Sequence, residues 1–296
     1  MSRIIRLPFK SAIISLVILL FLLSSTNVLG WSAAGHMIVA KIAYDRLNSH
    51  AKSEVDRLMA VQLGPDDAIK SSDFINASHW ADDIKGSKTF PRFDDDHFID
   101  YPFSTDGTPL PKDEPKPENI VKALNGDVEI LKTSKDDKAR AQALRFIIHF
   151  VGDIHQPLHA ETRVSKAFPN GDRGGNDFRI DTERLHALWD NGIDTFPKSS
   201  PPPEYAPPPI SSIVPIAEQA VKEYPESDPA WKAGGPFDFT GWAKESFEIS
   251  RDFVYKGLSE NAAPSAQYRN EAVAIVHHRI AWGGYRLAAL LNSIWP

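Results

Sequence analysis

The most constraining feature of this sequence is a strongly apolar helical pattern that carries a histidine and an aspartate. Between Asp136 and His155 the apolar residues recur at the spacing of a wide helical face, and Pro157 stops the helix. His149 and Asp153 lie four residues apart, so a helix places both on one face, within reach of one ion. Such pairs also occur by chance and then make only a surface hydrogen bond, so this pair alone leaves both interpretations open.

Apolar positions at helical spacing predict further helices on both sides of this one. They cover Ser32–Asn48, Ala51–Val61, Ile120–Leu131, Arg184–Asn191, Thr240–Leu258 and Ala266–Ile294. One short strand is expected at Asp177–Ile180, and residues 197–209, with seven prolines, predict an extended surface loop. The pattern therefore predicts a mainly α fold, a single compact helical domain with a small β-hairpin at most.

The first 30 residues have the pattern of a secretory signal peptide. Three basic residues precede an apolar run over Ala12–Leu23, which is too short to span a bilayer. We expect cleavage between Gly30 and Trp31, secretion of the product, and one catalytic domain over residues 31–296. In a eukaryotic secretory pathway, the single sequon at Asn76 would be glycosylated.

Charge and cysteine content restrict how such a product could bind its substrate. Removal of the leader leaves 30 Lys and Arg against 39 Asp and Glu, a formal net charge of −9. A chain this acidic does not hold polyanions on a broad basic surface, so any phosphate must be attracted locally, and bound cations are the obvious source. Because the sequence has no cysteine, any cross-linking must come from metals.

Further imidazoles and carboxylates strengthen the metal interpretation. His186 and Asp190 repeat the four-residue spacing. His159 lies six residues after the aspartate of the first pair, beyond the proline, where the chain can turn and offer a ligand to a second ion. Asp82 and His97 lie upstream amid aromatic residues, and the alternative makes them a helix-end acid and a core histidine.

The order of these motifs closely resembles the zinc-dependent single-strand-specific nucleases, the type I or S1/P1 nuclease family. The matching segments are Trp31 with His36, Trp80-Ala81-Asp82, His97-Phe98-Ile99-Asp100, His149 to Asp153, Gln156-Pro157-Leu158-His159, Gly174-Gly175-Asn176, and His186 with Asp190. The resemblance extends from Trp31 to the segment 283–288 of the last predicted helix. It implies a largely helical fold, shared with zinc-dependent phospholipases C, that holds three zinc ions at the bottom of a cleft.

By matching position, the resemblance implies the ligands of each zinc ion. The first zinc is held by Asp82, His97, His149 and Asp153. The second is held by His36, the shared carboxylate of Asp153, and the α-amino nitrogen and carbonyl oxygen of Trp31. The third is held by His159, His186 and Asp190. Since an indole has no lone pair suited to zinc, Trp31 can serve only as the terminal residue, which makes leader cleavage part of building the site.

The resemblance also implies the reaction. Two zinc ions bridged by Asp153 hold a water and lower its pKa, while the third stabilises the leaving 3′ oxygen, so that hydrolysis yields a 5′-phosphate. Lys85 matches a basic position and would clamp the phosphate, although a solvated surface lysine is the alternative. Asp100 would orient a metal ligand or the attacking water.

Single-stranded DNA and RNA are the implied substrates, because metal ions at the bottom of a cleft cannot be reached by a base inside a duplex. Phe98 matches the stacking residue of the family, with a core phenylalanine as the alternative. Asn176 and Asn191 would read base edges or would only satisfy turn geometry. Activity on 3′-mononucleotides is a further expectation. Nothing in the sequence implies a protein partner or stable membrane association, so we expect a monomer.

A zinc-dependent phospholipase C is the nearest alternative, since those enzymes resemble this family in their three metals and N-terminal tryptophan ligand. Against it stand Phe98, the Gly174-Gly175-Asn176 segment, and the lack of a membrane-binding extension. The chain departs from many family members in lacking disulfides, and it has Tyr101-Pro102 where fungal members often have an acidic residue.

Overall fold

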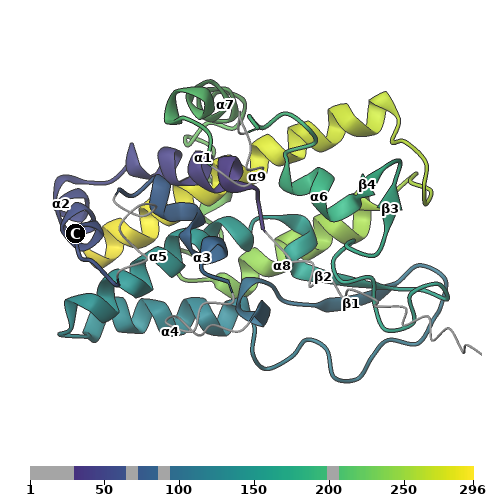
Figure 1. Cartoon of the computed structure of the whole chain (residues 1–296), viewed down its shortest axis with the longest axis horizontal. Coiled ribbons are helices and arrows are strands. Elements are labelled where there is room, and N and C mark those ends of the chain that lie inside the picture. The colour runs from purple at the N-terminus through teal and green to yellow at the C-terminus, as the bar shows by residue number, and fades with distance from the viewer. Residues whose placement is uncertain (1–29, 65–72, 86–93, 199–206) are drawn as a thin grey trace, which may run out of the picture.

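The structure is a computed structural model that describes residues 30–64, 73–85, 94–198 and 207–296. The α-helices of this part are α1 (Ala33–Tyr44), α2 (Ser49–Met59), α3 (Trp80–Asp83), α4 (Ile120–Thr133), α5 (Asp137–Asp153), α6 (Leu185–Asp190), α7 (Ile210–Glu223), α8 (Phe239–Ile249) and α9 (Ala266–Ile294). Short 3-10 turns are η2 (Asn76–His79), η3 (Asp94–His97), η4 (Pro157–Ala160) and η5 (Pro229–Lys232), and η6 (Ser250–Val254) is a π turn. The prediction of a mainly α fold is confirmed (Figure 1).

Four short strands form two separate sheets. The strands β3 (Arg179–Ile180) and β4 (Glu183–Arg184) make the small antiparallel hairpin. The strands β1 (Tyr101–Ser104) and β2 (Glu161–Val164) pair in parallel, a contact between distant segments that no local pattern predicts. Because β1 lies shortly after η3 and β2 directly follows η4, this pairing places two histidine-bearing turns side by side.

Helix α5 runs through the middle of the molecule, where it contacts α1, α2, α4 and α9 (Figure 1). Twelve of its 17 residues are buried, so neighbours surround it on nearly every side. The helix begins where the Asp136 side chain accepts the Lys138 N–H, which satisfies one of the unpaired N–H groups of the first turn. Just after its other end, Gln156 and Pro157 begin the turn η4, which carries His159.

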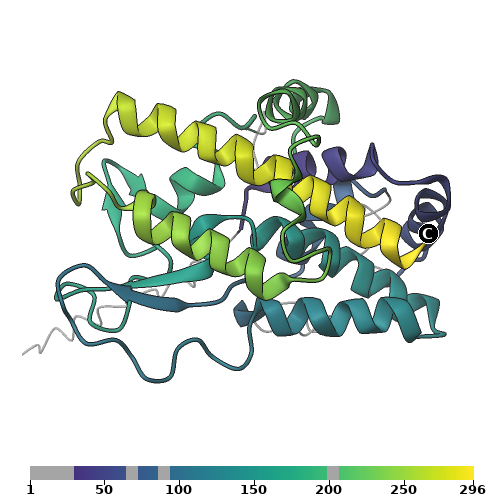
Figure 2. The same cartoon turned by 180° about the vertical axis from the view of Figure 1, so that it is seen from behind.

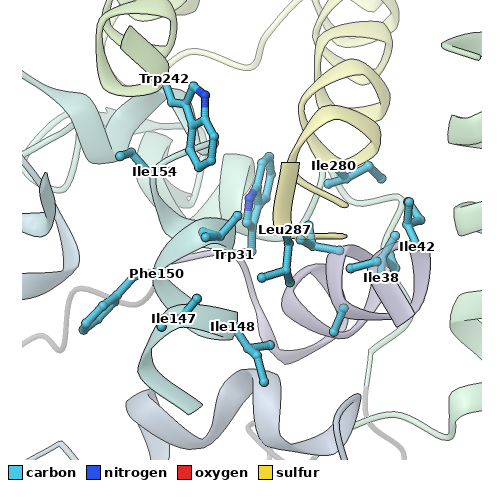
Figure 3. Close-up of a cluster of buried hydrophobic side chains, with 14 of the residues drawn as sticks. Trp31, Ile38, Ile42, Ile147, Ile148, Phe150, Ile154, Trp242, Ile280 and Leu287 are labelled. Atoms are coloured by element: carbon cyan, nitrogen blue, oxygen red, sulfur yellow. The ribbon is translucent and has the colours of Figure 1, made fainter. Parts of the chain in front are cut away.

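The long helix α9, which lies in front in the view of Figure 2, crosses α5 and packs against α1 and α7. The hydrophobic core is one cluster that includes Trp31 and Trp242 with aliphatic side chains of α1, α5 and α9 (Figure 3). Within the described ranges, no helix has both the length and the apolar content needed to cross a membrane.

Helix α7 is the main element that the sequence pattern does not predict. Pro209 and Pro215 suggest a break, yet Pro215 lies inside the helix. Burial of Ile213, Ala217 and Ala220 against α1 and α9 compensates for the hydrogen bond that the proline cannot donate. Of the proline-rich segment, residues 199–206 lie outside the described residues, as do residues 1–29 of the expected leader.

The expected single helix over residues 240–258 is also different in the structure. It forms as α8, which ends at Ile249, followed by the π turn η6. The wider π turn carries the chain onward to Tyr255, whose side chain is buried.

Two buried arginines of α9 fix the turn that follows α5. Arg279 Nε donates to the His155 carbonyl at 3.1 Å, and Arg286 Nη1 donates to His155 Nε2 at 3.0 Å. Both guanidinium groups also pair with Glu245 of α8, at 3.1 Å and 2.6 Å. This network ties α8 and α9 to the end of α5, where Asp153 lies.

We predict that Glu245→Ala lowers the free energy of unfolding by about 3 kcal/mol, because it leaves two guanidinium groups buried without their carboxylate. Denaturant unfolding measures the change. Glu226→Ala is the matched control, since Glu226 pairs with Arg46 at the surface and its loss should cost less than about 1 kcal/mol. Equal losses in the two variants would contradict the structural role of this network.

Candidate metal centre

The carboxylate of Asp153 lies at the end of α5 and is fully buried. Its two oxygens face different ligand atoms. Oδ2 lies 3.0 Å from His149 Nε2 and 3.0 Å from His97 Nδ1, while Oδ1 lies 3.3 Å from His36 Nε2. A carboxylate in this arrangement can bridge two cations, one on each oxygen.

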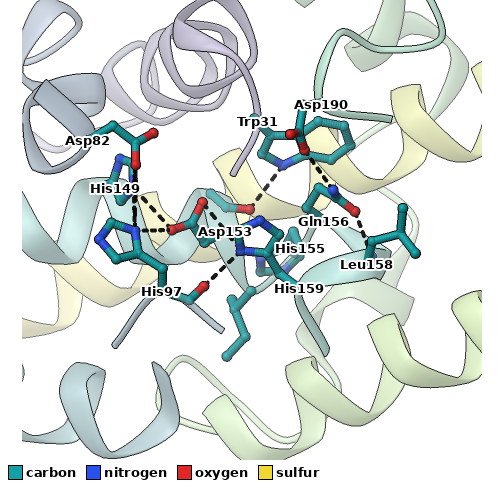
Figure 4. Close-up of polar contacts among 12 residues, drawn as sticks. Trp31, Asp82, His97, His149, Asp153, His155, Gln156, Leu158, His159 and Asp190 are labelled. Atoms are coloured by element: carbon teal, nitrogen blue, oxygen red, sulfur yellow. Dashed lines mark hydrogen bonds and ion pairs between the residues drawn. The ribbon is translucent and has the colours of Figure 1, made fainter. Parts of the chain in front are cut away.

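Asp82 of α3 faces the same group of imidazoles (Figure 4). Its Oδ1 lies 3.6 Å from His149 Nε2 and 3.7 Å from His97 Nδ1, and its Oδ2 lies 4.0 Å from His36 Nε2. We call Asp82, His97, His149, Asp153 and His36 the Asp153 cluster. The chain thus brings three helices and η3 together at one buried point, as the resemblance implies.

Lys85 also belongs to this place, because its Nζ lies 2.7 Å from Asp82 Oδ1 and its side chain is only 7% exposed. Burial by itself raises the pKa of Asp82, but Lys85 and His149 outweigh burial and hold that pKa below its usual range. The alternative of a solvated surface lysine therefore does not fit the structure.

A second group, the His159 cluster, consists of His159 on η4 with His186 and Asp190 on α6. The ligand atoms of these residues lie within 4.8 Å of one another. The Nε2 atoms of the two histidines are 3.2 Å apart, and His186 Nε2 is 3.4 Å from Asp190 Oδ2. His159 Nδ1 lies 3.8 Å from Asp153 Oδ1, so the two clusters adjoin each other.

Backbone carbonyls determine which ring nitrogen carries the proton. His149 Nδ1 lies 2.8 Å from Ser78 O, His159 Nδ1 lies 2.8 Å from His97 O, and His186 Nδ1 lies 2.6 Å from Gly174 O. Since a carbonyl oxygen only accepts, each Nδ1 donates, and the neutral form of each ring then presents its lone pair at Nε2. Two such lone pairs face each other across 3.2 Å in the His159 cluster and repel unless a cation or a proton lies between them.

His36 gives a second indication that these residues fit a cation. Its ring is buried, and neither ring nitrogen has a hydrogen-bond partner among the described residues. Burial lowers the pKa of His36 to about 4 and that of His97 to about 3, which keeps both imidazoles in the neutral form that binds metals. The donors are nitrogen and carboxylate oxygen atoms, a set suited to zinc.

Gly152 makes room for this histidine. A Cβ atom at position 152 would lie 2.6 Å from His36 Nδ1, so any larger residue would displace the imidazole. The His149-Phe150-Val151-Gly152-Asp153 segment therefore needs a glycine for a reason that its helical spacing does not reveal.

The Trp31 side chain anchors the beginning of the described chain. Its indole Nε1 donates to Gly152 O at 3.0 Å, and its ring packs against Phe196 with centroids 5.8 Å apart. The next residue, Ser32, donates its N–H to Asp190 O at 2.9 Å. These contacts hold the backbone of Trp31 beside both clusters (Figure 4).

Gly30 lies in the gap between the ligands of the Asp153 cluster. A Cβ atom at this position would lie 1.6 Å from Asp153 Oδ1 and 3.1 Å from His36 Nε2. The residue before Trp31 therefore occupies space that a cation shared by His36 and Asp153 would need.

The structure favours different alternatives for the expected substrate-binding residues. Phe98 is partly exposed and is not a member of the hydrophobic core, so the alternative of a core phenylalanine does not fit. Asn176 donates its side-chain amide to Arg173 O at 2.9 Å, and Asn191 donates its own to Ala187 O at 3.0 Å. For both asparagines these contacts favour the turn-geometry alternative.

Asp100 is partly exposed. Burial, followed by the negative charge of Glu114, raises its pKa to about 7 against the opposing effect of Lys116. Its electrostatic neighbours also include Asp95 and Asp172. The expected role in orienting a ligand or water thus finds no direct contact in the described residues.

Asn76, the expected glycosylation site, begins η2. Its side-chain amide donates to Asp73 Oδ2 at 2.6 Å, and the residue is partly exposed. Glycosylation of this amide would replace or rearrange that contact.

Gln156 is a positioning residue. It belongs to the Gln156-Pro157-Leu158-His159 motif, but the sequence alone does not reveal its role. Its Nε2 donates to Asp190 Oδ1 at 2.8 Å, while its Oε1 accepts the Leu158 N–H at 2.6 Å. The amide thus orients the carboxylate of the His159 cluster. The backbone carbonyls that orient the three histidines could not be predicted from the sequence either, because every residue has a carbonyl group.

Comparison with known proteins adds independent findings. The family model S1/P1 Nuclease matches residues 31–296. Endonuclease 2 of Arabidopsis thaliana is 28% identical, with 96% of this chain and 97% of the relative covered. Nuclease S1 of Aspergillus oryzae is 26% identical over 97% of both chains, and Nuclease P1 of Penicillium citrinum is 23% identical over 89% of this chain and 97% of the relative.

We predict that removal of divalent metal lowers the melting temperature. A cation that binds only the folded chain stabilises it by about 4 kcal/mol at a free concentration 1,000 times its Kd. Loss of one such ion should lower Tm by roughly 10 °C for a chain of this size. Calorimetry with EDTA, against EDTA already saturated with zinc, checks this, and identical melting curves would contradict a stabilising metal centre.

Proposed function

Since the chain belongs to the S1/P1 nuclease family, we propose that it is a secreted zinc-dependent endonuclease that hydrolyses single-stranded DNA and RNA. The family makes it a nuclease, a hydrolase of phosphodiester bonds. The observation that carries the finer proposal is the Asp153 carboxylate, whose two oxygens face separate groups of imidazoles, beside the facing lone pairs of His159 and His186.

The proposed ligand sets follow the two clusters. Asp82, His97, His149 and Asp153 would hold one zinc ion. His36, Asp153 and the terminal amine and carbonyl of Trp31 would hold a second. His159, His186 and Asp190 would hold a third. The name Nuclease S1 belongs to a relative whose match covers almost the whole chain, which supports transfer of the nuclease activity.

Bound zinc would supply Lewis acidity, which lowers the pKa of a coordinated water and neutralises charge on the phosphate. The residues of the chain fix the geometry. Asp153 sets the spacing of two cations, and carbonyl contacts hold the imidazoles of His149, His159 and His186 in the ligating tautomer. Lys85, held against Asp82, would donate to a phosphate oxygen at the edge of the cluster.

Hydrolysis at this site would break the bond between phosphorus and the 3′ oxygen. The incoming water gives its oxygen to phosphorus, the 5′ side keeps the phosphate, and the 3′ oxygen leaves as a hydroxyl group. A 3′-mononucleotide presents the same bond, so 3′-nucleotidase activity is part of the proposal.

Preference for single strands follows from burial of the reacting centre. The ligand side chains are almost completely buried, so a phosphate can reach them only if its nucleotide leaves a regular duplex. Phe98 lies next to His97, is partly exposed, and would stack on an unpaired base. The chain's net negative charge is consistent with attraction confined to the cations.

Secretion is proposed from the leader pattern over residues 1–30, and we propose residues 31–296 as one catalytic domain. The single hydrophobic cluster, which joins helices from both ends of the described chain, supports that division. Glycosylation at Asn76 and a monomeric state remain part of the same proposal.

The direct test is product mapping on matched single-stranded and duplex oligonucleotides. A zinc-loaded chain that begins at Trp31 should cut single strands into 5′-phosphate products and leave the duplex largely intact. Phosphatidylcholine vesicles serve as the second substrate. Release of phosphocholine with intact oligonucleotides would favour the phospholipase alternative.

We predict that Asp153→Asn abolishes activity and removes two zinc ions, because an amide bridges cations poorly and the loss affects both sides. Elemental analysis and cleavage of single-stranded DNA measure the effect, which should exceed a 1,000-fold fall in rate, or about 4 kcal/mol in transition-state stabilisation. Asp238→Asn makes the same chemical change at the N-cap of α8, where an amide also caps, and should retain both properties. Full zinc content in Asp153→Asn would refute the bridging role.

A second prediction concerns the start of the chain. Protein that begins at Gly30 should bind zinc poorly between His36 and Asp153 and should be nearly inactive, because residue 30 fills this gap and blocks the Trp31 amine. Zinc analysis and activity of the two forms measure the difference. One extra residue after Pro296 is the control and should change neither property. Equal zinc content and activity in the two forms would mean that the amine is not a ligand.

A further inference from the structure

A group of buried acids lies behind the His159 cluster and takes no part in the proposed reaction. Glu161 and Asp172 are both fully buried, and their carboxyl groups converge on one atom, the hydroxyl of Tyr255. Tyr255 Oη lies 2.7 Å from Glu161 Oε1 and 2.7 Å from Asp172 Oδ2. The Arg163 guanidinium covers the Tyr255 ring at 4.5 Å, which closes this group on one side.

The hydrogen-bonding capacity of the Tyr255 hydroxyl explains how it joins the carboxyl groups of Glu161 and Asp172. A tyrosine hydroxyl has one proton to donate and lone pairs that accept, so it can hydrogen-bond to both carboxyl groups at once. Asp172 Oδ1 accepts the backbone N–H groups of Arg163 and Gly175, at 3.0 Å and 3.2 Å, so both of its oxygens are engaged. Both carboxyl groups thus meet at the Tyr255 hydroxyl, and backbone N–H groups hold Asp172 in place from its other oxygen.

Each carboxyl group fixes a different segment of the His159 cluster: Glu161 that of His159, and Asp172 the loop that orients His186. Glu161 begins β2 immediately after η4, two residues from His159. Asp172 holds the Gly175 N–H, and in that same loop Gly174 O accepts from His186 Nδ1 while Gly175 O accepts the His186 N–H. The loop sits close to the tyrosine, since a Cβ atom at Gly175 would lie 3.3 Å from Tyr255 Oη.

We infer that the Tyr255 hydroxyl is a positioning group that holds the segments of His159 and His186 at the spacing which a cation between their Nε2 atoms requires. It joins the residue that follows η6 to β2 and to the loop before β3, which both lie far from it in sequence (Figure 1). The inference rests on the proposed function, because it assigns a metal to the His159 cluster.

Tyr255→Phe tests this role, since it removes the hydroxyl and keeps the ring under Arg163. We expect zinc at the His159 cluster to bind about 10- to 100-fold more weakly, the usual effect of losing a group that orients a ligand. Zinc release to a chromophoric chelator measures this without any activity assay. Tyr285→Phe is the matched control: it removes a buried hydroxyl that donates to Tyr224 O at 2.7 Å and should retain wild-type affinity.

His186→Ala separates failure of the inference from failure of the proposed function. If this variant contains as much zinc as the wild type, the metal assignment itself is wrong. If it loses one ion while Tyr255→Phe releases zinc like the wild type, only the positioning role is overturned.

Two further variants keep the test decisive if Tyr255→Phe does not fold. Asp172→Ala detaches the loop from the tyrosine and should weaken zinc binding to a similar extent. Glu161→Gln keeps the size of the side chain and can donate an amide proton to the tyrosine oxygen, so it should retain wild-type affinity. Unchanged affinity in Asp172→Ala, or a 10-fold loss in Glu161→Gln, would contradict the proposed arrangement.

Discussion

The rest of the structure depends on one buried carboxylate. Asp153 is fully enclosed at the end of a helix that is itself surrounded, and isolated burial of such a charge costs several kcal/mol. Burial by itself raises its pKa, yet His149 and His159 outweigh burial and keep that pKa well below the usual range. A chain that maintains this charge inside its core needs a compensating positive charge there, and cations held between Asp153 and the imidazoles would provide it when those rings bind in their neutral form.

The fold can be understood as the means of holding that carboxylate in place. Arg279 and Arg286 of α9 fix the turn after α5 through His155, while α1 places His36 beside the Asp153 carboxylate. The parallel pairing of β1 with β2 aligns the segments of His97 and His159. Two further hydrogen bonds join these segments: the Ile99 N–H donates to His159 O, and the His159 side chain donates through Nδ1 to His97 O. The imidazoles of His149, His159 and His186 are thus oriented by backbone carbonyls from other segments of the chain.

Much of this arrangement could be predicted from sequence, because four-residue spacing on a helix fixes a common face for His149 with Asp153 and for His186 with Asp190. The mainly α fold followed from the same periodicity. Helix α7 could not be predicted, since burial against α1 and α9 outweighs the effect of Pro215. The parallel strands, the carbonyl contacts and the meeting of Glu161 with Asp172 depend on tertiary placement. Asp100 matched a motif, but the structure places it among other acids.

The central claim is that Asp153 bridges two zinc ions and that a third lies in the His159 cluster. Anomalous X-ray diffraction at the zinc absorption edge, on crystals of the chain that begins at Trp31, tests it most directly. The account predicts three peaks: one on each side of the Asp153 carboxylate, and one between His159, His186 and Asp190. Absence of a peak at Asp153, or a single peak there with none at the His159 cluster, would contradict it.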